Sequence, residues 1–132
     1  MVIDTSALVA ILFAEAEQKR FIELIQQADV RMTSAASLLE TTMVIEAVFG
    51  QAAGRDLDLF LNKGEISIIS VDREQIEAAR TAWRKYGKGR HPAALNFGEC
   101  FVYALAKISG EPILAKGKDF PLTDISMCEP VL

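Results

Sequence analysis

Short apolar runs alternate with stretches of helical spacing along the whole chain. Residues 1–3 are an apolar run that ends at Asp4, and residues 7–13 have a helical pattern. An amphipathic helix is predicted next, because apolar residues recur at i, i+3, i+4 and i+7 over Phe21, Leu24, Ile25 and Ala28. The further helical segments are 37–49, 56–63, 73–86 and 97–109, and the further strands are 31–34, 66–71, 112–115 and a short last one at 125–127.

Strands that alternate with helices predict an α/β fold, a parallel sheet with helices on both faces. No repeat, low-complexity tract or linker interrupts the 132 residues, so we expect one domain over residues 1–132. In such sheets ligands bind beyond the carboxyl ends of the strands. That rule points to Asp4, after the first strand, and to residues 116–119, after the strand at 112–115.

Composition favours a packed globular protein, with 51% hydrophobic residues and few Pro and Gly. The apolar start of the chain is interrupted by Asp4, and neither a basic segment nor a small-residue cleavage site flanks it. We therefore expect a first strand and helix there, not a signal peptide or a membrane span. Cys100 and Cys128 lack metal-type spacing, which predicts two free thiols in a reduced, cytoplasmic setting.

Charge is segregated along the chain, although its net value is −4. Residues 80–118 contain eight Lys and Arg against two acids, a net charge of +6, whereas the remaining residues carry −10. Segregation of this kind indicates a local surface for an anionic partner, which the overall charge hides. A solvated helix face followed by a loop is the alternative interpretation of the same charges.

Four acidic residues stand beside apolar sequence, where a charge is costly. They are Asp4, Glu40, Glu99 and Asp119. Glu40 lies on a helix whose Met43, Val44 and Ala47 we expect to be buried. Buried carboxylates are rare unless they are paired or bound to a metal, and hard oxygen ligands without His or Cys suit Mg²⁺ or Mn²⁺.

Each carboxylate also has a purely structural interpretation. Ser37 and Glu40 have the spacing of a capping box, and Asn96 and Glu99 have a related one. Asp4 would cap a helix, and the fourth acid would begin a turn. The strand-end rule and the charge segregation select the same end of the fold, which favours a site, and a glutamate in a first helical turn can both cap and face a metal.

Four segments, in order along the chain, resemble the motifs of PIN-domain ribonucleases, and of the VapC toxins of bacterial toxin–antitoxin pairs in particular. Residues 2–8 resemble the opening motif and residues 37–40 the second. Residues 91–106 are similar to the third VapC motif and residues 116–120 to the fourth. The resemblance covers essentially the whole chain.

The resemblance implies a three-layer α/β/α sandwich and hydrolysis of an RNA phosphodiester by a metal-activated water. It implies that one or two Mg²⁺ or Mn²⁺ ions are held by the catalytic carboxylates Asp4, Glu40, Glu99 and Asp119. Thr5 or Ser6 would lend a hydroxyl outside the metal ligands, and Asp124 is a candidate for a similar outer role, or else a surface turn. Family members dimerise and are silenced by a cognate antitoxin of the VapB type.

One residue departs from the family pattern. The third motif usually carries Asp where this chain has Glu99, and the extra methylene moves the carboxylate by about 1.5 Å. We expect Glu99 to face a metal from the first turn of its helix, with Asn96 capping that helix alone. The alternative is a non-catalytic module that binds RNA or protein, with a degenerate metal site.

The basic segment supplies the candidates for RNA contact, and they are Arg84, Lys85, Lys88, Arg90 and His91. His91 has no His or Cys partner in the sequence, which argues against a metal ligand. Trp83 and Tyr86 alternate with Arg and Lys, as in base-stacking surfaces, although the spacing of Trp83 is also that of a core residue.

Two other phosphoryl-transfer folds that begin with a strand and an acid do not match. The haloacid-dehalogenase type requires Asp-x-Asp, and position 6 is Ser6. A receiver domain requires a phosphoacceptor Asp after a central strand, whereas Asp56 and Asp58 lie in a helical pattern. A nuclease that acts on DNA would share the carboxylate pocket and differ only in its substrate.

Overall fold

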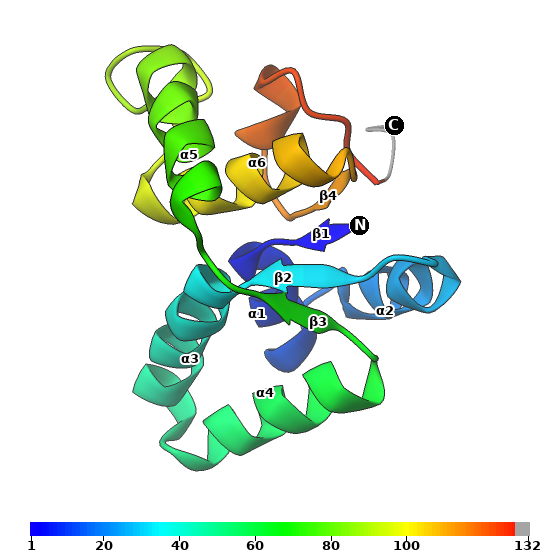
Figure 1. Ribbon diagram of the computed structural model, residues 1–132. Helices are drawn as coiled ribbons and strands as arrows, with labels where there is room; N and C mark the ends of the chain where they lie inside the picture. The colour runs from blue at the N-terminus through cyan, green and yellow to red at the C-terminus, as the bar shows by residue number, and fades with distance from the viewer. Residues whose placement is uncertain (129–132) are drawn as a thin grey trace.

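Four short parallel strands form the centre of the computed structural model, which describes residues 1–128 (Figure 1). They are β1 (Val2–Ile3), β2 (Met32–Ser34), β3 (Ser67–Ile69) and β4 (Ile113–Leu114), in the order β3-β2-β1-β4. β1 pairs with β2 on one side and with β4 on the other. The direction of the crossover connections therefore changes at β1, and the carboxyl end of this strand is where such folds place ligands.

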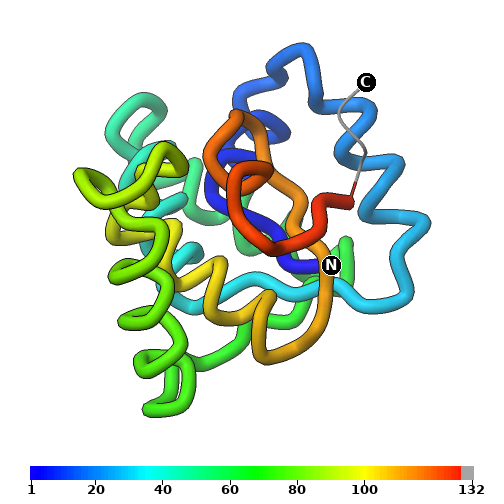
Figure 2. The backbone as a smooth tube through the Cα atoms, turned by 90° about the horizontal axis from the view of Figure 1, so that it is seen from above, coloured from blue at the N-terminus to red at the C-terminus, as the bar shows by residue number. Residues whose placement is uncertain are grey.

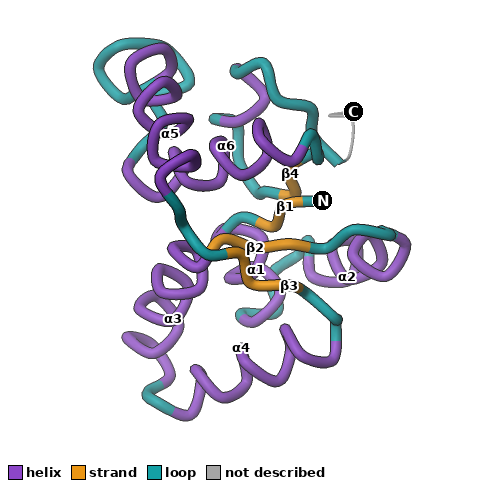
Figure 3. The backbone as a smooth tube through the Cα atoms, viewed as in Figure 1, coloured by secondary structure: helices purple, strands orange, loops and turns teal. Residues whose placement is uncertain are grey.

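Helices cover both faces of the sheet, as Figures 1 and 3 show. One layer contains α1 (Thr5–Leu12), α2 (Gln18–Gln27), α3 (Ala35–Phe49) and α4 (Ala52–Lys63), and the other contains α5 (Arg73–Tyr86) and α6 (Phe97–Ser109). The side chains of Ile3 and Leu114 enter the first core, whereas those of Val2 and Ile113 enter the second. This alternation along the strands confirms the predicted three-layer sandwich.

The chain after β4 folds back over the molecule (Figure 2). A 3₁₀ turn, η1 (Phe120–Leu122), is followed by a segment whose backbone bonds to Ile113 at Ser126 and Cys128. The last strand predicted at 125–127 is wrong, because only a single parallel bridge joins Met127 to Ile113. No helix among the described residues is long and apolar enough to cross a membrane, and Cys100 and Cys128 are free thiols, as predicted.

Two helices have the predicted bounds, and two others begin before their apolar pattern does. α5 and α6 have the predicted bounds, and Gly110 ends α6 in the left-handed conformation. α1 begins at Thr5, directly after its cap Asp4, and α4 begins at Ala52, four residues before the predicted start. Apolar spacing therefore located these helices but missed first turns that contain small or polar residues.

The face of α3 that the sequence placed in the core is exposed. Met43 is 65% exposed and Val44 and Ala47 are also exposed, so the expectation that they are buried is wrong. The buried face of α3 instead carries Ser37, Thr41 and Ile45, which pack toward α1. Because α3 has apolar residues all around, hydrophobicity alone did not identify its inner face.

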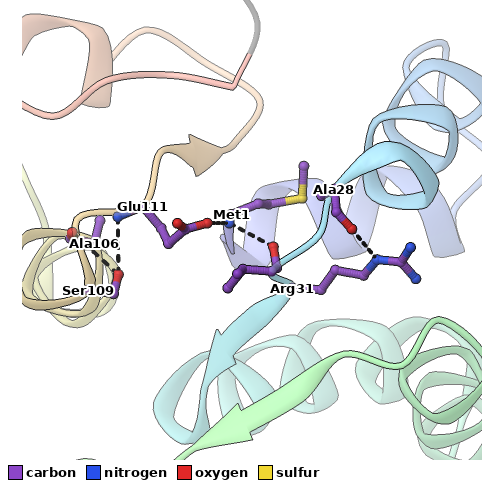
Figure 4. A network of polar contacts seen from close by, with 7 residues as sticks. Met1, Ala28, Arg31, Ala106, Ser109 and Glu111 are labelled. Carbon is purple, nitrogen blue, oxygen red and sulfur yellow. Dashed lines mark hydrogen bonds and ion pairs between the residues drawn. The ribbon is translucent and has the colours of Figure 1, made fainter.

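Charged groups at the amino ends of the strands are compensated (Figure 4). The amine of Met1 donates to the carbonyl of Val30 at 2.8 Å and forms an ion pair with Glu111. The guanidinium of Arg31 donates at 2.8–3.0 Å to three carbonyls, those of Gln26, Ala28 and Gly64. Paired charges therefore link the starts of β1, β2 and β4 at the amino-terminal end of the sheet.

Candidate active site

Asp4 connects the central strand to α1 at the switch point of the sheet. Its side chain is 5% exposed, and its Oδ2 accepts a hydrogen bond from the N–H of Ser6 at 3.0 Å, which caps α1. Burial raises the pKa of Asp4 above its ordinary value, and the charge of Glu40 raises that pKa further. Asp4 is thus both a helix cap and a buried acid with a second acid nearby.

Glu40 reaches the site from the second turn of α3. The cap of α3 is Ser34, whose Oγ accepts from the N–H of Ala36 at 3.2 Å. The predicted capping box between Ser37 and Glu40 is therefore wrong, because the helix begins directly after β2 and Ser37 already lies inside it. The carboxylate of Glu40 is free of this structural role and lies against the backbone of Gly98 on α6.

Glu99 occupies the first turn of α6 within a complete capping box. The Oδ1 of Asn96 accepts from the N–H of Glu99 at 2.9 Å, and the Oε1 of Glu99 accepts from the N–H of Asn96 at 3.0 Å. The expectation that Asn96 caps alone is wrong, since the glutamate is long enough to reach back. Burial, together with the carboxyl groups of Asp119 and Asp4, raises the pKa of Glu99 to about 7.

Asp119 lies on the exposed loop that follows β4, just before η1, and its side chain caps no helix. Its carboxyl group lies close enough to that of Glu99 to raise the pKa of Glu99. The Oγ of Ser6 accepts from the N–H of Lys116 at 2.9 Å, which ties the loop to α1. The hydroxyl of Thr5 donates to the carbonyl of Ser37 at 3.4 Å and ties α1 to α3.

The four carboxylates approach one another without a cationic partner. No ion pair in the described part of the chain involves any of them, and each interacts electrostatically with at least one other. Four hard oxygen donors that repel one another suit a divalent cation such as Mg²⁺ or Mn²⁺. Within residues 1–128, no three Asp, Glu, His or Cys side chains are already gathered as a closed ligand set. The donor set therefore fits such an ion in its chemistry.

Both carboxylate oxygens of Asp124 contact side chains of α6. Its Oδ1 accepts from the hydroxyl of Tyr103 at 2.5 Å, and its Oδ2 pairs with the ammonium of Lys107 at 2.8 Å. These partners lower the pKa of Asp124 to about 2. The contacts anchor the segment after β4 on α6, and the outer role predicted for Asp124 stays a prediction.

Only part of the basic segment is available to an anion. Ion pairs occupy Arg80, Lys107 and Lys116. Within residues 1–128 no ion pair involves the exposed candidates for RNA contact on the last turn of α5 and the following loop, which are Arg84, Lys85, Lys88 and Arg90.

The loop after α5 returns to the start of α6. The N–H of Lys88 donates to the carbonyl of Leu95 at 3.0 Å, which holds Lys88 beside the N-terminus of α6. Within this loop the Nδ1 of His91 accepts from the N–H of Ala93 at 3.0 Å, and the imidazole meets the ring of Tyr86 edge-on. Trp83 is 46% exposed, not a core residue, and the guanidinium of Arg90 lies 4.0 Å from its ring centre.

Gly98 was not singled out by the sequence, yet it is the point where α6 meets Glu40. A signal was present, because glycine is unfavourable in the first turns of a helix compared with alanine. A glycine inside a predicted helix and next to a candidate acid therefore indicates a close approach at that point.

A parallel sheet with four converging acids at the carboxyl end of its central strand defines the class of protein. The family model of the PIN domain matches residues 1–125, and the chain belongs to this family.

Curated relatives narrow the comparison to VapC ribonucleases. The chain is 54% identical to Ribonuclease VapC30 of Mycobacterium tuberculosis over 126 residues, which is 96% of each chain. It is 53% identical to Ribonuclease VapC of Mycolicibacterium smegmatis, over 96% of this chain and 98% of the other. The crystal structure of M. tuberculosis VapC20, described as a Sarcin-Ricin loop cleaving toxin, shares the fold with a TM-score of 0.79, 20% identity and 98% coverage of both chains.

Proposed function

We propose that the chain is an endoribonuclease that hydrolyses RNA phosphodiester bonds at Asp4, Glu40, Glu99 and Asp119, and that it is the toxin of a toxin–antitoxin pair. One observation carries this proposal: four acids without cationic partners converge at the switch point of a chain that is 54% identical to a VapC ribonuclease. In this proposal the four carboxylates hold one or two divalent ions, Mg²⁺ or Mn²⁺.

The acids differ in burial and in the hydrogen bonds that hold them. Asp4 is buried and held by its capping hydrogen bond, whereas Asp119 lies on an exposed loop. Glu99 accepts the Asn96 N–H with Oε1, so its Oε2 is the oxygen left to face the site. A bound divalent ion would lower the pKa of water and stabilise charge on the phosphoryl and leaving oxygens.

Thr5 and Ser6 act in this proposal through the elements that they join. The Thr5 hydroxyl fixes α1 to the helix that carries Glu40, and Ser6 fixes α1 to the loop that carries Asp119. Both residues therefore set the separation between acids from different elements. Metal sites depend on such outer interactions, and removing one commonly weakens affinity about 10–100-fold.

RNA is the substrate that the free cations favour. Lys88 is held beside the start of α6, and Arg84 and Lys85 lie on the last turn of the preceding helix. We place the RNA backbone along these cations, so that a phosphate reaches the carboxylates. A DNA substrate would find the same charges, and digestion of matched RNA and DNA strands distinguishes the two.

The nuclease proposal is tested with purified protein, Mn²⁺ and a structured RNA. Asp4→Asn should abolish most of the cleavage, while Glu46→Gln on α3 serves as a matched control that should cleave like the parent. Cleavage by Asp4→Asn at the parent's rate would contradict the proposal. A parent that binds RNA but cleaves none at any Mn²⁺ concentration would favour the binding-module alternative.

The exposed apolar face of α3 supports a homodimer as part of this proposal. Leu39 and Met43 are each more than 60% exposed, and Phe97 on α6 is 83% exposed. Between these helices lies a groove of about 680 Å³, with Glu40 and Gly98 at its edge. An apolar patch of this kind marks a protein contact, and a second copy would cover it by a two-fold contact of α3 with α3.

Light scattering tests the dimer. Met43→Asp should convert a dimer to a monomer, whereas Leu59→Asp, at a leucine on α4 that is 53% exposed against 65% for Met43, should not. A monomeric parent would contradict the dimer and leave the nuclease proposal standing.

A cognate antitoxin of the VapB type is the remaining partner, supported by the names of the relatives. Co-expression with the adjacent reading frame tests whether toxicity is suppressed.

A further inference from the structure

Gly98 is the second residue of α6, and the carboxylate of Glu40 lies directly against it. A Cβ atom at position 98 would stand 2.4 Å from Oε2, 2.7 Å from Oε1 and 2.8 Å from Cδ of Glu40. Real Cβ atoms essentially never approach within 3.0 Å, and ordinary contact begins at 3.4 Å. The carboxylate therefore occupies the space that any side chain at position 98 would need.

Backbone conformation does not explain this glycine. Positive φ angles occur at Gly50, Gly89, Gly110 and Gly117, whereas Gly98 has an ordinary helical backbone. Alanine is the more favourable residue at a helical position with such a backbone. The reason for glycine at position 98 is thus the close approach of Glu40.

We propose that Gly98 is a positioning residue for Glu40: its missing Cβ lets the carboxylate from α3 lie on the first turn of α6, next in sequence to Glu99. The inference rests on the proposed function, because it concerns the ligand geometry of the same site. The positive end of the α6 dipole favours a carboxylate at this place. Gly98 thereby brings together two acids that are 59 residues apart in the sequence.

Alanine at position 98 would displace the acid without removing it. To restore a 3.4 Å contact, the Glu40 carboxylate must retreat by about 1 Å from the Cβ. Misplacement by about 1 Å commonly costs an active site about 100-fold in rate, and removal of an orienting interaction weakens metal affinity by about 10–100-fold. The expected defect lies in metal affinity and not in folding.

The chain contains a matched control for this substitution. Gly54 in α4 faces Glu46, which also lies on α3, and a Cβ at position 54 would stand 2.2 Å from Oε2 of Glu46. Gly54→Ala therefore adds one methyl group against a glutamate of the same helix, away from the four acids. It reproduces the steric change without touching the site.

The test is the affinity for Mn²⁺ alone, measured by titration calorimetry without RNA on the parent, Glu40→Gln, Gly98→Ala and Gly54→Ala. We expect Gly98→Ala to weaken Mn²⁺ binding about tenfold or more, with a melting temperature at or above that of the parent, and Gly54→Ala to bind like the parent. The double variant Gly98→Ala/Glu40→Asp shortens the acid by about 1.5 Å and should bind Mn²⁺ more tightly than Gly98→Ala alone.

Three outcomes would overturn the inference. If Gly98→Ala binds Mn²⁺ like the parent while Glu40→Gln does not, the positioning role is wrong and the proposed function stands. If Gly54→Ala weakens binding as much as Gly98→Ala, the effect is general packing. If the parent itself binds no Mn²⁺, the proposed function fails, and the positioning role fails with it.

Discussion

Charged groups are paired at the amino ends of the parallel strands, whereas at the carboxyl ends acids lie together without cationic partners. At the amino ends, the Met1 amine meets Glu111, and Arg31 donates to three backbone carbonyls. At the carboxyl ends, four acids approach one another and burial raises the pKa of both Asp4 and Glu99. Paired charges stabilise a fold, whereas like charges without a partner lower its stability. This difference supports the proposal that the carboxyl end of the sheet binds a ligand.

The largest expected effect is on RNA cleavage at the uncompensated end. Glu99→Gln keeps the size and the capping ability of the side chain but removes the charge that a hard cation requires. Cleavage in Mn²⁺ should fall by at least about 100-fold, the decrease typical of a misplaced catalytic group, while the melting temperature stays close to that of the parent. Glu99→Asp should retain activity, since it keeps the charge. Gel analysis of end-labelled RNA measures both, and unchanged cleavage by Glu99→Gln would remove Glu99 from the site.

The next largest effect is the stabilisation by Mn²⁺, which should depend on the carboxyl end of the sheet and not on the amino end. Mn²⁺ at about 100 times its dissociation constant should stabilise the parent by about 2.7 kcal/mol. Asp4→Asn should melt at or above the metal-free parent and lose most of the Mn²⁺ response. Arg31→Met at the compensated end should lower stability by about 1.5–3 kcal/mol, as expected for hydrogen bonds from a charged group, and keep the full Mn²⁺ response. Differential scanning fluorimetry measures these shifts. Equal stabilisation of the parent by Mn²⁺ and by NaCl of the same ionic strength would contradict a specific metal site.

A smaller effect concerns pH. The pKa of Glu99 is about 7 in the folded protein against an ordinary 4.5, so the folded state binds more protons than the unfolded state between these values. Protonation of Glu99 therefore contributes to the free energy of unfolding. This contribution is fully present below pH 4.5 and is lost as pH rises through 7. Because water screens the half-buried group, we expect a loss of about 1 kcal/mol. Metal-free denaturation from pH 4.5 to 8 measures it, with Glu99→Gln as the reference. A parent and a variant with the same pH slope would contradict the assignment.

The smallest effect concerns the salt dependence of RNA binding. Arg84→Ala/Lys88→Ala should flatten the slope of log affinity against log salt by roughly 0.7 for each phosphate of a single strand that the variant no longer neutralises. Arg73→Ala/Lys63→Ala, with the same change of charge on other surfaces, is the control. Fluorescence anisotropy gives the slopes, and an unchanged slope in the first variant would place the RNA elsewhere.

Much of the fold followed from local sequence, and the errors have a common physical origin. The predicted bounds of α5 and α6 match the structure, in which Asp72, Asn96 and Gly110 occupy the helix ends. The inner face of α3 was assigned wrongly, because Met43 and Val44 are as apolar as the buried Ile45. Which apolar face enters the core depends on the packing of α1, and no local pattern contains that information.

The candidate site was predicted from the sequence as a set of residues but not as a geometry. The four acids were singled out because each stands beside apolar sequence, and the strand-end rule and the resemblance in motifs pointed to the same residues. The reciprocal capping of Glu99 by Asn96 and the contact of Glu40 with Gly98 appear only when α3 and α6 are placed in space. Side-chain length and helix approach decide both contacts, and neither is a property of one segment.

Crystals soaked in Mn²⁺ offer the most direct measurement of the central claim, because anomalous scattering locates the ion without reference to activity. The account predicts an anomalous peak among Asp4, Glu40, Glu99 and Asp119, with an oxygen of Glu99 in its coordination sphere. A peak elsewhere, or no peak in crystals whose carboxylates are accessible to solvent, would contradict the claim that the carboxyl end of this sheet is a metal-dependent active site.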